Sequence, residues 1–174
     1  MEPKYVEAIK AGIIGGIILA ALELISNIVS LLRIIKAEDL PTEANPALTG
    51  AVVAAILFGC CICILYIVVL AGTGAMAVSM SKGLLRDLND AVVNSAFAGA
   101  VAGLIWGVAS VVLGFLSSII NPDNATVASK FGGGIAKGIC GIICCLPAEI
   151  VIGAVIALIG GAIYYELAGK KHSA

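Results

Sequence analysis

The stretch Phe131–Lys171, FGGGIAKGICGIICCLPAEIVIGAVIALIGGAIYYELAGKK, decides how this chain is built. From Ile135 to Ala168 it is apolar apart from three charged residues. A helix of that length spans roughly 50 Å, whereas the hydrocarbon of a bilayer is about 30 Å thick. We therefore expect this segment to cross a membrane and also to tilt, kink or protrude. Pro147 predicts a kink, because it removes one backbone N–H and leaves the carbonyl of Ile143 without its helical partner.

The rest of the chain has the same character. Of the 174 residues, 61% are hydrophobic and 12% are charged, about half the charged share of a soluble domain. The net charge of −1 argues against a nucleic-acid-binding surface. We predict an all-α, polytopic membrane protein that forms a single membrane domain over residues 1–174. Its four transmembrane helices are expected at about 11–35, 50–80, 91–120 and 135–168.

Lysine and arginine predict the orientation in the membrane. One side receives the N-terminus, the linker between the second and third spans, and the C-terminus, with six basic residues. The other side receives three, and Lys137 lies a turn or two inside the fourth span. Because basic loops stay in the cytoplasm, both termini are predicted to be cytoplasmic, in the cell membrane.

The spans look duplicated as tandem two-helix hairpins, 1–80 and 88–168. Gly12 and Gly16 match Gly99 and Gly103 at an offset of 87 residues. Cys60 and Cys61 match Cys144 and Cys145 at an offset of 84. A repeat of two spans keeps its orientation, so the halves would be related by an axis along the membrane normal.

Glycines recur every four residues along three of the predicted spans. This spacing gives a helix a smooth ridge, along which a neighbouring backbone can approach closely. The ridges could pack the four spans together within one chain, or they could form the interface of an oligomer or of a partner subunit. The ridge residues are Gly12, Gly16, Gly99, Gly103, Gly107, Gly134 and Gly138.

Six cysteines are placed so that they could form one layer in the second and fourth spans. They could be small apolar packing residues, a disulfide between the two spans, or a metal or redox site. A Cys-x-x-Cys pair has metal spacing, but burial in lipid works against thiolate chemistry. We predict no metal and no cofactor. The cysteines are Cys60, Cys61, Cys63, Cys140, Cys144 and Cys145.

Two carboxylates in the predicted spans are the sharpest candidates for chemistry. Glu23 lies near the middle of the first span, with Asn27 one turn further on, and Glu149 follows Pro147 in the fourth. A charged carboxyl at mid-bilayer is costly, so each must face protein or water and be neutral or paired. Either could bind a proton or a cation. Alternatively, Glu149 pairs with Lys137 or is a neutral acid bound to a neighbouring helix. Trp106, in the middle of the third span, is interpreted as a packing residue.

Two resemblances add expectations. The segments KAGIIGGIILAAL (Lys10–Leu22), GCCICILYIVVLAGTGAMAV (Gly59–Val78) and GAVAGLIWGVASVVLG (Gly99–Gly114) resemble small four-span membrane proteins of archaea and bacteria with a cysteine-rich second span. This likeness implies a fold and no activity.

In plan, the chain is similar to the four-span proteolipid ring subunit of rotary ATPases. That likeness implies that Glu149 is an ion-binding glutamate. The departures are a third span without a companion polar site, the absence of compact polar turns, Pro147 and the cysteines.

The sequence has no recognisable catalytic motif. We predict a non-enzymatic integral membrane protein that acts through helix association in the lipid bilayer, as a homo-oligomer or as a small subunit of a membrane complex. The alternative is an ion- or proton-translocating protein that uses Glu149, with Glu23 and Asn27 assisting. A third interpretation is a redox or metal-binding membrane protein that uses the cysteines.

Overall fold

The computed structural model describes residues 2–37, 46–85, 87–120, 143 and 145–169. This part of the chain is helical and contains no strand. Each long helix includes a segment long and apolar enough to cross a membrane, so the all-α, four-span prediction is confirmed and the fold indicates an integral membrane protein. The helices are α1 (Pro3–Ala37), α2 (Pro46–Met80), α3 (Leu88–Ile120) and α5 (Leu146–Gly169).

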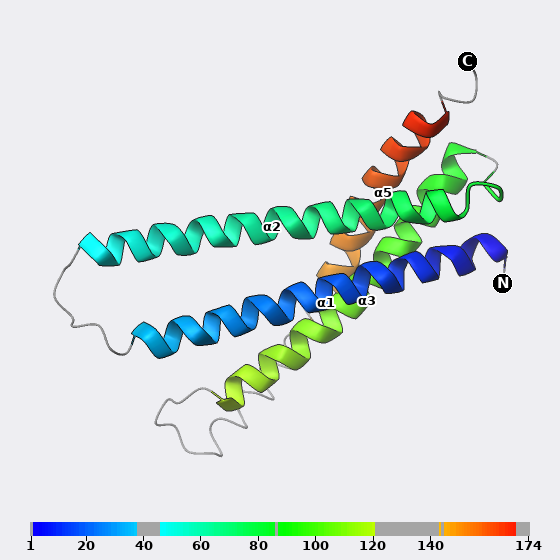
Figure 1. Cartoon of the computed structure of the whole chain (residues 1–174). Helices are drawn as coiled ribbons and strands as arrows, with labels where there is room; N and C mark the ends of the chain where they lie inside the picture. Colours follow the sequence, from blue (N-terminus) through cyan, green and yellow to red (C-terminus); the bar gives the residue numbers. More distant parts are fainter. Residues whose placement is uncertain (1, 38–45, 86, 121–142, 144, 170–174) are drawn as a thin grey trace.

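The four helices form two pairs that cross. α1 and α2 run side by side, and α3 and α5 cross them obliquely (Figure 1). α1 contacts α2 and α3, and α5 contacts α2 and α3, whereas α1 and α5 share no contact among the described residues. The start of α1, the connection from α2 to α3 and the end of α5 gather at one end of the bundle (Figure 1). We call this the N-terminal end.

Helix α1 starts earlier than the sequence predicted. The first span was expected at about 11–35, and the chain is helical from Pro3 onward. Proline is favoured in the first helical turn, where its missing N–H costs nothing. The side chains of Glu7 and Lys10 form an ion pair of 2.7 Å, and Ala8 is fully buried in the bundle. Packing therefore extends the helix beyond its apolar stretch.

The backbone just before Pro147, where the sequence predicted a kink, departs from regular α-helical geometry. Helix α5 begins at Leu146, so the proline lies in its first turn. The described residues just before it, Ile143 and Cys145, have π-helical backbone geometry. In a π-helical turn a carbonyl pairs with the N–H five residues on rather than four. The carbonyl of Ile143 therefore does not depend on the N–H that Pro147 lacks. The remainder of the predicted span, residues 135–142 and Cys144, lies outside the described residues.

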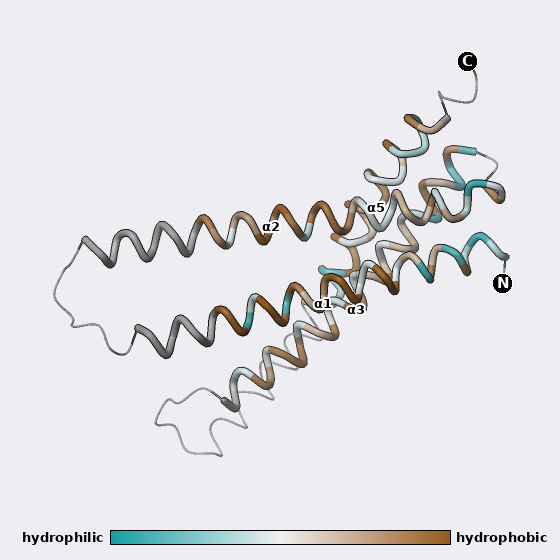
Figure 2. Tube along the Cα trace, in the orientation of Figure 1, coloured by the Kyte–Doolittle hydropathy of each residue, from teal (hydrophilic) through white to brown (hydrophobic). Residues whose placement is uncertain are grey.

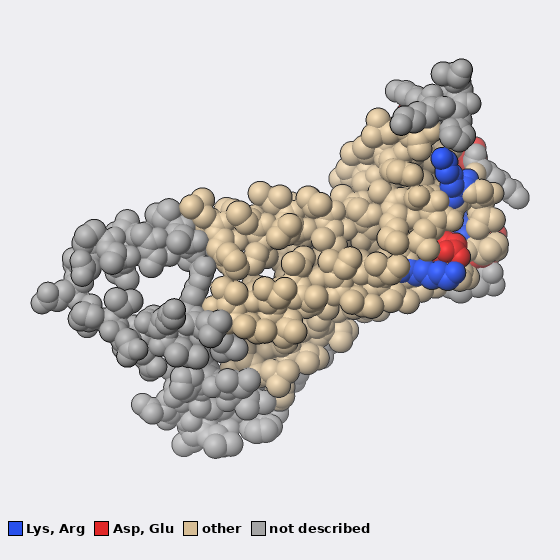
Figure 3. Space-filling model, in the orientation of Figure 1, with Lys and Arg blue, Asp and Glu red and all other residues tan. Residues whose placement is uncertain are grey.

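Small residues fill the interior, and large apolar residues face outward. The fully buried set consists mainly of alanines, such as Ala11, Ala98 and Ala102. Ile17 and Leu57 are about 60% exposed, as suits side chains that face acyl chains. Among the described residues on the face shown in Figure 3, the charged side chains gather at the N-terminal end, and Figure 2 shows hydrophilic positions at the same end.

The glycine ridge of α3 packs against α5 inside the protein. A Cβ atom added at Gly103 would lie 2.5 Å from the backbone oxygen of Glu149. One added at Gly153 would lie 2.5 Å from the backbone oxygen of Gly99. These distances are too short for a real Cβ, so glycine is what lets the two backbones touch. Gly12 and Gly16 are likewise buried, against α3.

The matched glycines of the two halves therefore have different neighbours. Gly12 and Gly16 face α3, across the two hairpins, whereas Gly99 and Gly103 face α5, inside the second hairpin. The duplication stays a prediction. Gly134 and Gly138 lie outside the described residues.

Candidate functional site

The Glu23 carboxylate lies where α1, α2 and α3 meet. Its Oε2 atom accepts hydrogen bonds from the Tyr66 hydroxyl at 2.5 Å and from the indole Nε1 of Trp106 at 3.3 Å. Its Oε1 atom accepts one from the Asn27 amide nitrogen at 3.3 Å. Tyr66 and Trp106 stack, with ring centroids 5.0 Å apart. Three side-chain donors from three helices therefore hold this carboxyl in place.

The Glu149 carboxyl lies at the start of α5 and faces α3. The Ser110 hydroxyl lies 3.1 Å from Oε1 and 3.3 Å from Oε2 of Glu149, and also 3.1 Å from the backbone oxygen of Gly107. A Cβ atom added at Gly107 would come within 2.5 Å of Oε2. The last glycine of the α3 ridge thus makes room for the carboxyl.

All four described helices contribute to one polar cluster. The group around Glu23 and the group around Glu149 meet on α3, where their donors Trp106 and Ser110 lie one helical turn apart. Within the described residues, the ion pairs join Lys4 to Glu2 and Asp90, and Lys10 to Glu7, and none includes either carboxyl of the cluster. Lys137, the cation that the sequence offered to Glu149, lies outside those residues. We define the carboxyl cluster as Glu23, Asn27, Tyr66, Trp106, Ser110 and Glu149.

The cluster lies deep in the bundle. Glu23 comes 13 residues after Lys10, which is about 20 Å along a helix. Both carboxyls are partly buried. Two carboxyl groups at this depth, without an ion pair among the described residues, are unusual in a membrane protein and make this cluster the candidate functional site.

The chain matches no family model, no curated protein and no solved structure. The two resemblances seen in the sequence therefore stay predictions, and the site must be interpreted from its own geometry.

Sequence reasoning found both carboxyls and Asn27 but missed three of their partners. Trp106 was interpreted as a packing residue, yet its indole N–H binds Glu23. The third span was expected to lack a companion polar site, which is wrong, because Ser110 binds Glu149. The available signal was an aromatic residue with a polar atom deep in a span: Tyr66 and Trp106 each need a buried acceptor.

The described cysteines lie apart from the carboxyl cluster's hydrogen bonds. Cys60, Cys61, Cys63 and Cys145 are free and exposed. The interpretation of the cysteines as interior packing residues is therefore wrong for these four. No group of three metal-ligating side chains occurs among the described residues. Cys140 and Cys144 lie outside them.

The two carboxyls are expected to differ in their effect on stability. Glu23→Ala leaves two donors, Tyr66 and Trp106, without their acceptor, whereas Asn27 keeps the backbone oxygen of residue 23. After Glu149→Ala the Ser110 hydroxyl keeps the backbone oxygen of Gly107. Each buried donor left unpaired costs about 1–3 kcal/mol. Glu23→Ala should therefore lower the free energy of unfolding by at least about 2 kcal/mol more than Glu149→Ala. Denaturant titration in micelles, followed by the fluorescence of the single tryptophan, measures the free energy of unfolding of both variants. Equal losses of stability in the two variants would contradict this geometry.

Proposed function

We propose that this protein conducts protons across the membrane and that the Glu149 carboxyl is the group that binds and releases the proton. The observation that carries the proposal is that Glu23 of α1 and Glu149 of α5 are bound by side chains one turn apart on α3, with no ion pair to either carboxyl among the described residues. Two negative charges in a medium of low dielectric constant repel strongly. One exchangeable proton relieves that repulsion.

The distribution of donors assigns a role to each carboxyl. Glu23 accepts from Tyr66, Trp106 and Asn27, and such bonds are strongest when the acceptor is ionised. It serves as the fixed negative charge of the site. Glu149 accepts only the Ser110 hydroxyl among the described side chains. It keeps lone pairs free and serves as the carrier.

The same donors favour a proton over a metal cation. A hard cation such as Ca²⁺ or Mg²⁺ takes about six or more oxygen ligands. The side chains around Glu23 donate O–H and N–H hydrogen bonds to its carboxylate. These bonds occupy the carboxylate oxygens that a cation would need as ligands. A proton needs only one acceptor oxygen, and Glu149 supplies two.

The experiment is proton flux in liposomes that contain the purified protein and a pH-sensitive dye, driven by a potassium diffusion potential. We expect faster internal pH change than in protein-free vesicles, and the same rate when choline replaces sodium. No flux above protein-free vesicles would overturn the proposal, and a rate that depends on sodium would assign the site to a cation.

Association with a second copy or another subunit stays a proposal, and it would have to use a surface other than the glycine ridges described here. The ridge residues Gly12, Gly16, Gly99, Gly103 and Gly107 are all buried against the chain's own helices. They are therefore not available to a second copy or to another subunit. The predicted cytoplasmic position of the termini would place the N-terminal end of the bundle inside the cell.

A further inference from the structure

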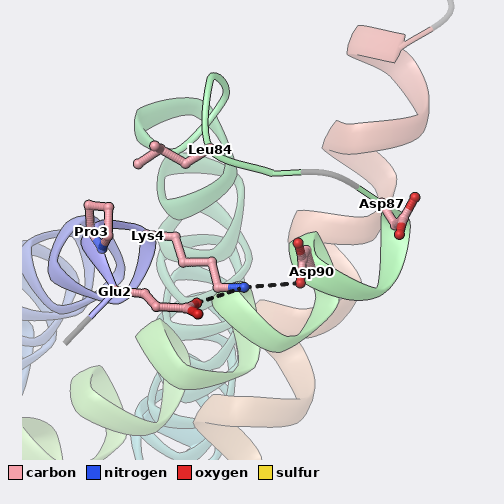
Figure 4. A pocket seen from close by; sticks show the side chains of 6 residues that line it. All are labelled: Glu2, Pro3, Lys4, Leu84, Asp87 and Asp90. Carbon is pink, nitrogen blue, oxygen red and sulfur yellow. Dashed lines mark hydrogen bonds and ion pairs between the residues drawn. The ribbon is translucent and has the colours of Figure 1, made fainter.

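A pocket of about 520 Å³ opens at the N-terminal end of the bundle (Figure 4). Lys4 extends between Glu2 and Asp90, with its Nζ 3.0 Å and 3.2 Å from their carboxylate oxygens. Three carboxylates and one ammonium group give the pocket a surplus of negative charge, which raises the local concentration of protons. The lining residues are Glu2, Pro3, Lys4, Leu84, Asp87 and Asp90.

Directly inward of the pocket lies a buried asparagine whose oxygen is unpaired. Asn94, one helical turn after Asp90, donates from Nδ2 to the Ser81 hydroxyl at 2.8 Å. That hydroxyl lies 3.5 Å from the backbone oxygen of Lys4, in the pocket wall. Asn94 is fully buried, and its Oδ1 atom has no hydrogen-bond partner in the described part of the chain. Buried oxygens of this kind are ordinarily satisfied by internal water.

Further buried hydroxyls continue inward from Asn94. Ser95 is fully buried, with its hydroxyl 2.7 Å from the backbone oxygen of Ala91 and 3.3 Å from that of Gly74. Thr73 is 3% exposed and donates to the backbone oxygen of Val69. Over residues 2–29, 57–85, 87–117, 143 and 145–168, the buried polar side chains are Thr73, Ser81, Asn94 and Ser95. All four of these residues lie between the pocket and the carboxyl cluster.

An apolar layer separates these residues from the carboxyl cluster. Leu19, Leu70 and Ala102 pack together and are almost fully buried. Tyr66 and Trp106, the donors to Glu23, pack against the same layer. From Asn94 to Trp106 the distance along α3 is 12 residues, or about 18 Å.

We infer that Thr73, Ser81, Asn94 and Ser95 line a water-binding path that carries protons from the pocket to the apolar layer, and that Leu19 and Leu70 close the path before the carboxyl cluster. The use of the path for protons rests on the proposed function. The presence of water along the path does not depend on that function and can be tested separately. The proton enters from water in the pocket, moves along hydrogen-bonded waters and hydroxyls, and reaches Glu149 when the layer opens.

Cysteine accessibility tests the path without reference to transport. Ser81→Cys and Thr73→Cys are introduced one at a time into the full chain with its six native cysteines replaced by alanine. The matched control is Val78→Cys, because Val78 lies between the two test positions in the sequence and is 2% exposed. Silver ions are added to the protein in nanodiscs, and unreacted thiols are counted with a maleimide after denaturation. We expect both path positions to react several-fold faster than the control.

Reaction of both path thiols at the control's rate would overturn the inference, since the hydroxyls would then serve only packing. Reaction at position 81 but not at position 73 would overturn it too, because the path would stop at Asn94. Asn94→Leu supplies the second arm: it removes the unpaired oxygen at similar volume and should slow proton flux in liposomes several-fold. If wild-type protein conducts no protons, the proposed function fails, and the silver reaction still decides whether the path exists.

Discussion

Glu149→Gln is expected to reduce proton flux in liposomes to the level of protein-free vesicles. Glutamine keeps the size of the side chain and can still accept from Ser110, which binds both carboxyl oxygens. It cannot gain and lose a proton in the range where a carboxyl does. The fold should therefore survive, and the loss should be confined to transport.

Glu166→Gln is the matched control, because Glu166 is exposed near the other end of the same helix. It should conduct as the wild type does. Glu23→Gln should keep part of the flux while weakening the site, since its amide oxygen can still accept a hydrogen bond from Tyr66 or Trp106. A Glu149→Gln variant that folds and conducts at the wild-type rate would remove the carboxyl from the mechanism.

Gly103→Ala is expected to destabilise the bundle by about 1–3 kcal/mol, the usual cost of overpacking a tight interior. The new Cβ would lie 2.5 Å from the backbone oxygen of Glu149 and 3.0 Å from the Cα of Ile150. Backbone atoms cannot move aside as a flexible side chain can, so α3 and α5 must separate. Denaturant titration in mixed micelles measures the loss, and flux should fall with it because Glu149 moves.

Gly114→Ala, on the same helix, is the control. A Cβ atom there would meet nothing within 4 Å. Alanine is a better helix former than glycine by about 1 kcal/mol, so this variant should be as stable as the wild type or slightly more stable. If both alanine variants behave alike, the close approach of α3 to α5 is not what holds the bundle together.

Sequence reasoning could predict the helices and the two carboxyls because both are local signals. Long apolar stretches predict spans by length and composition, and an acidic residue within a span is conspicuous by its cost. Glycine spacing also predicted close contact, although not which helices would meet. Gly12 and Gly99 share a motif but pack against α3 and α5 respectively.

The partners of the carboxyls depend on how the helices cross, which no periodicity encodes. Tyr66 lies 43 positions from Glu23 in the sequence, and Trp106 lies 83. A tryptophan in mid-span is compatible with packing alone until a neighbouring helix brings an acceptor to its indole nitrogen. The early start of α1 has the same origin, because burial of Ala8 in the bundle outweighs the polar composition of that segment.

The most direct test of the account is infrared difference spectroscopy of the reconstituted protein during a pH titration. Glu149 should give a carboxyl C=O band that appears when the proton binds and disappears when it leaves. The band should be lost in Glu149→Gln and kept in Glu166→Gln. A spectrum with no titrating carboxyl in the membrane, or a band that persists in Glu149→Gln, would contradict the assignment of the exchangeable proton to Glu149.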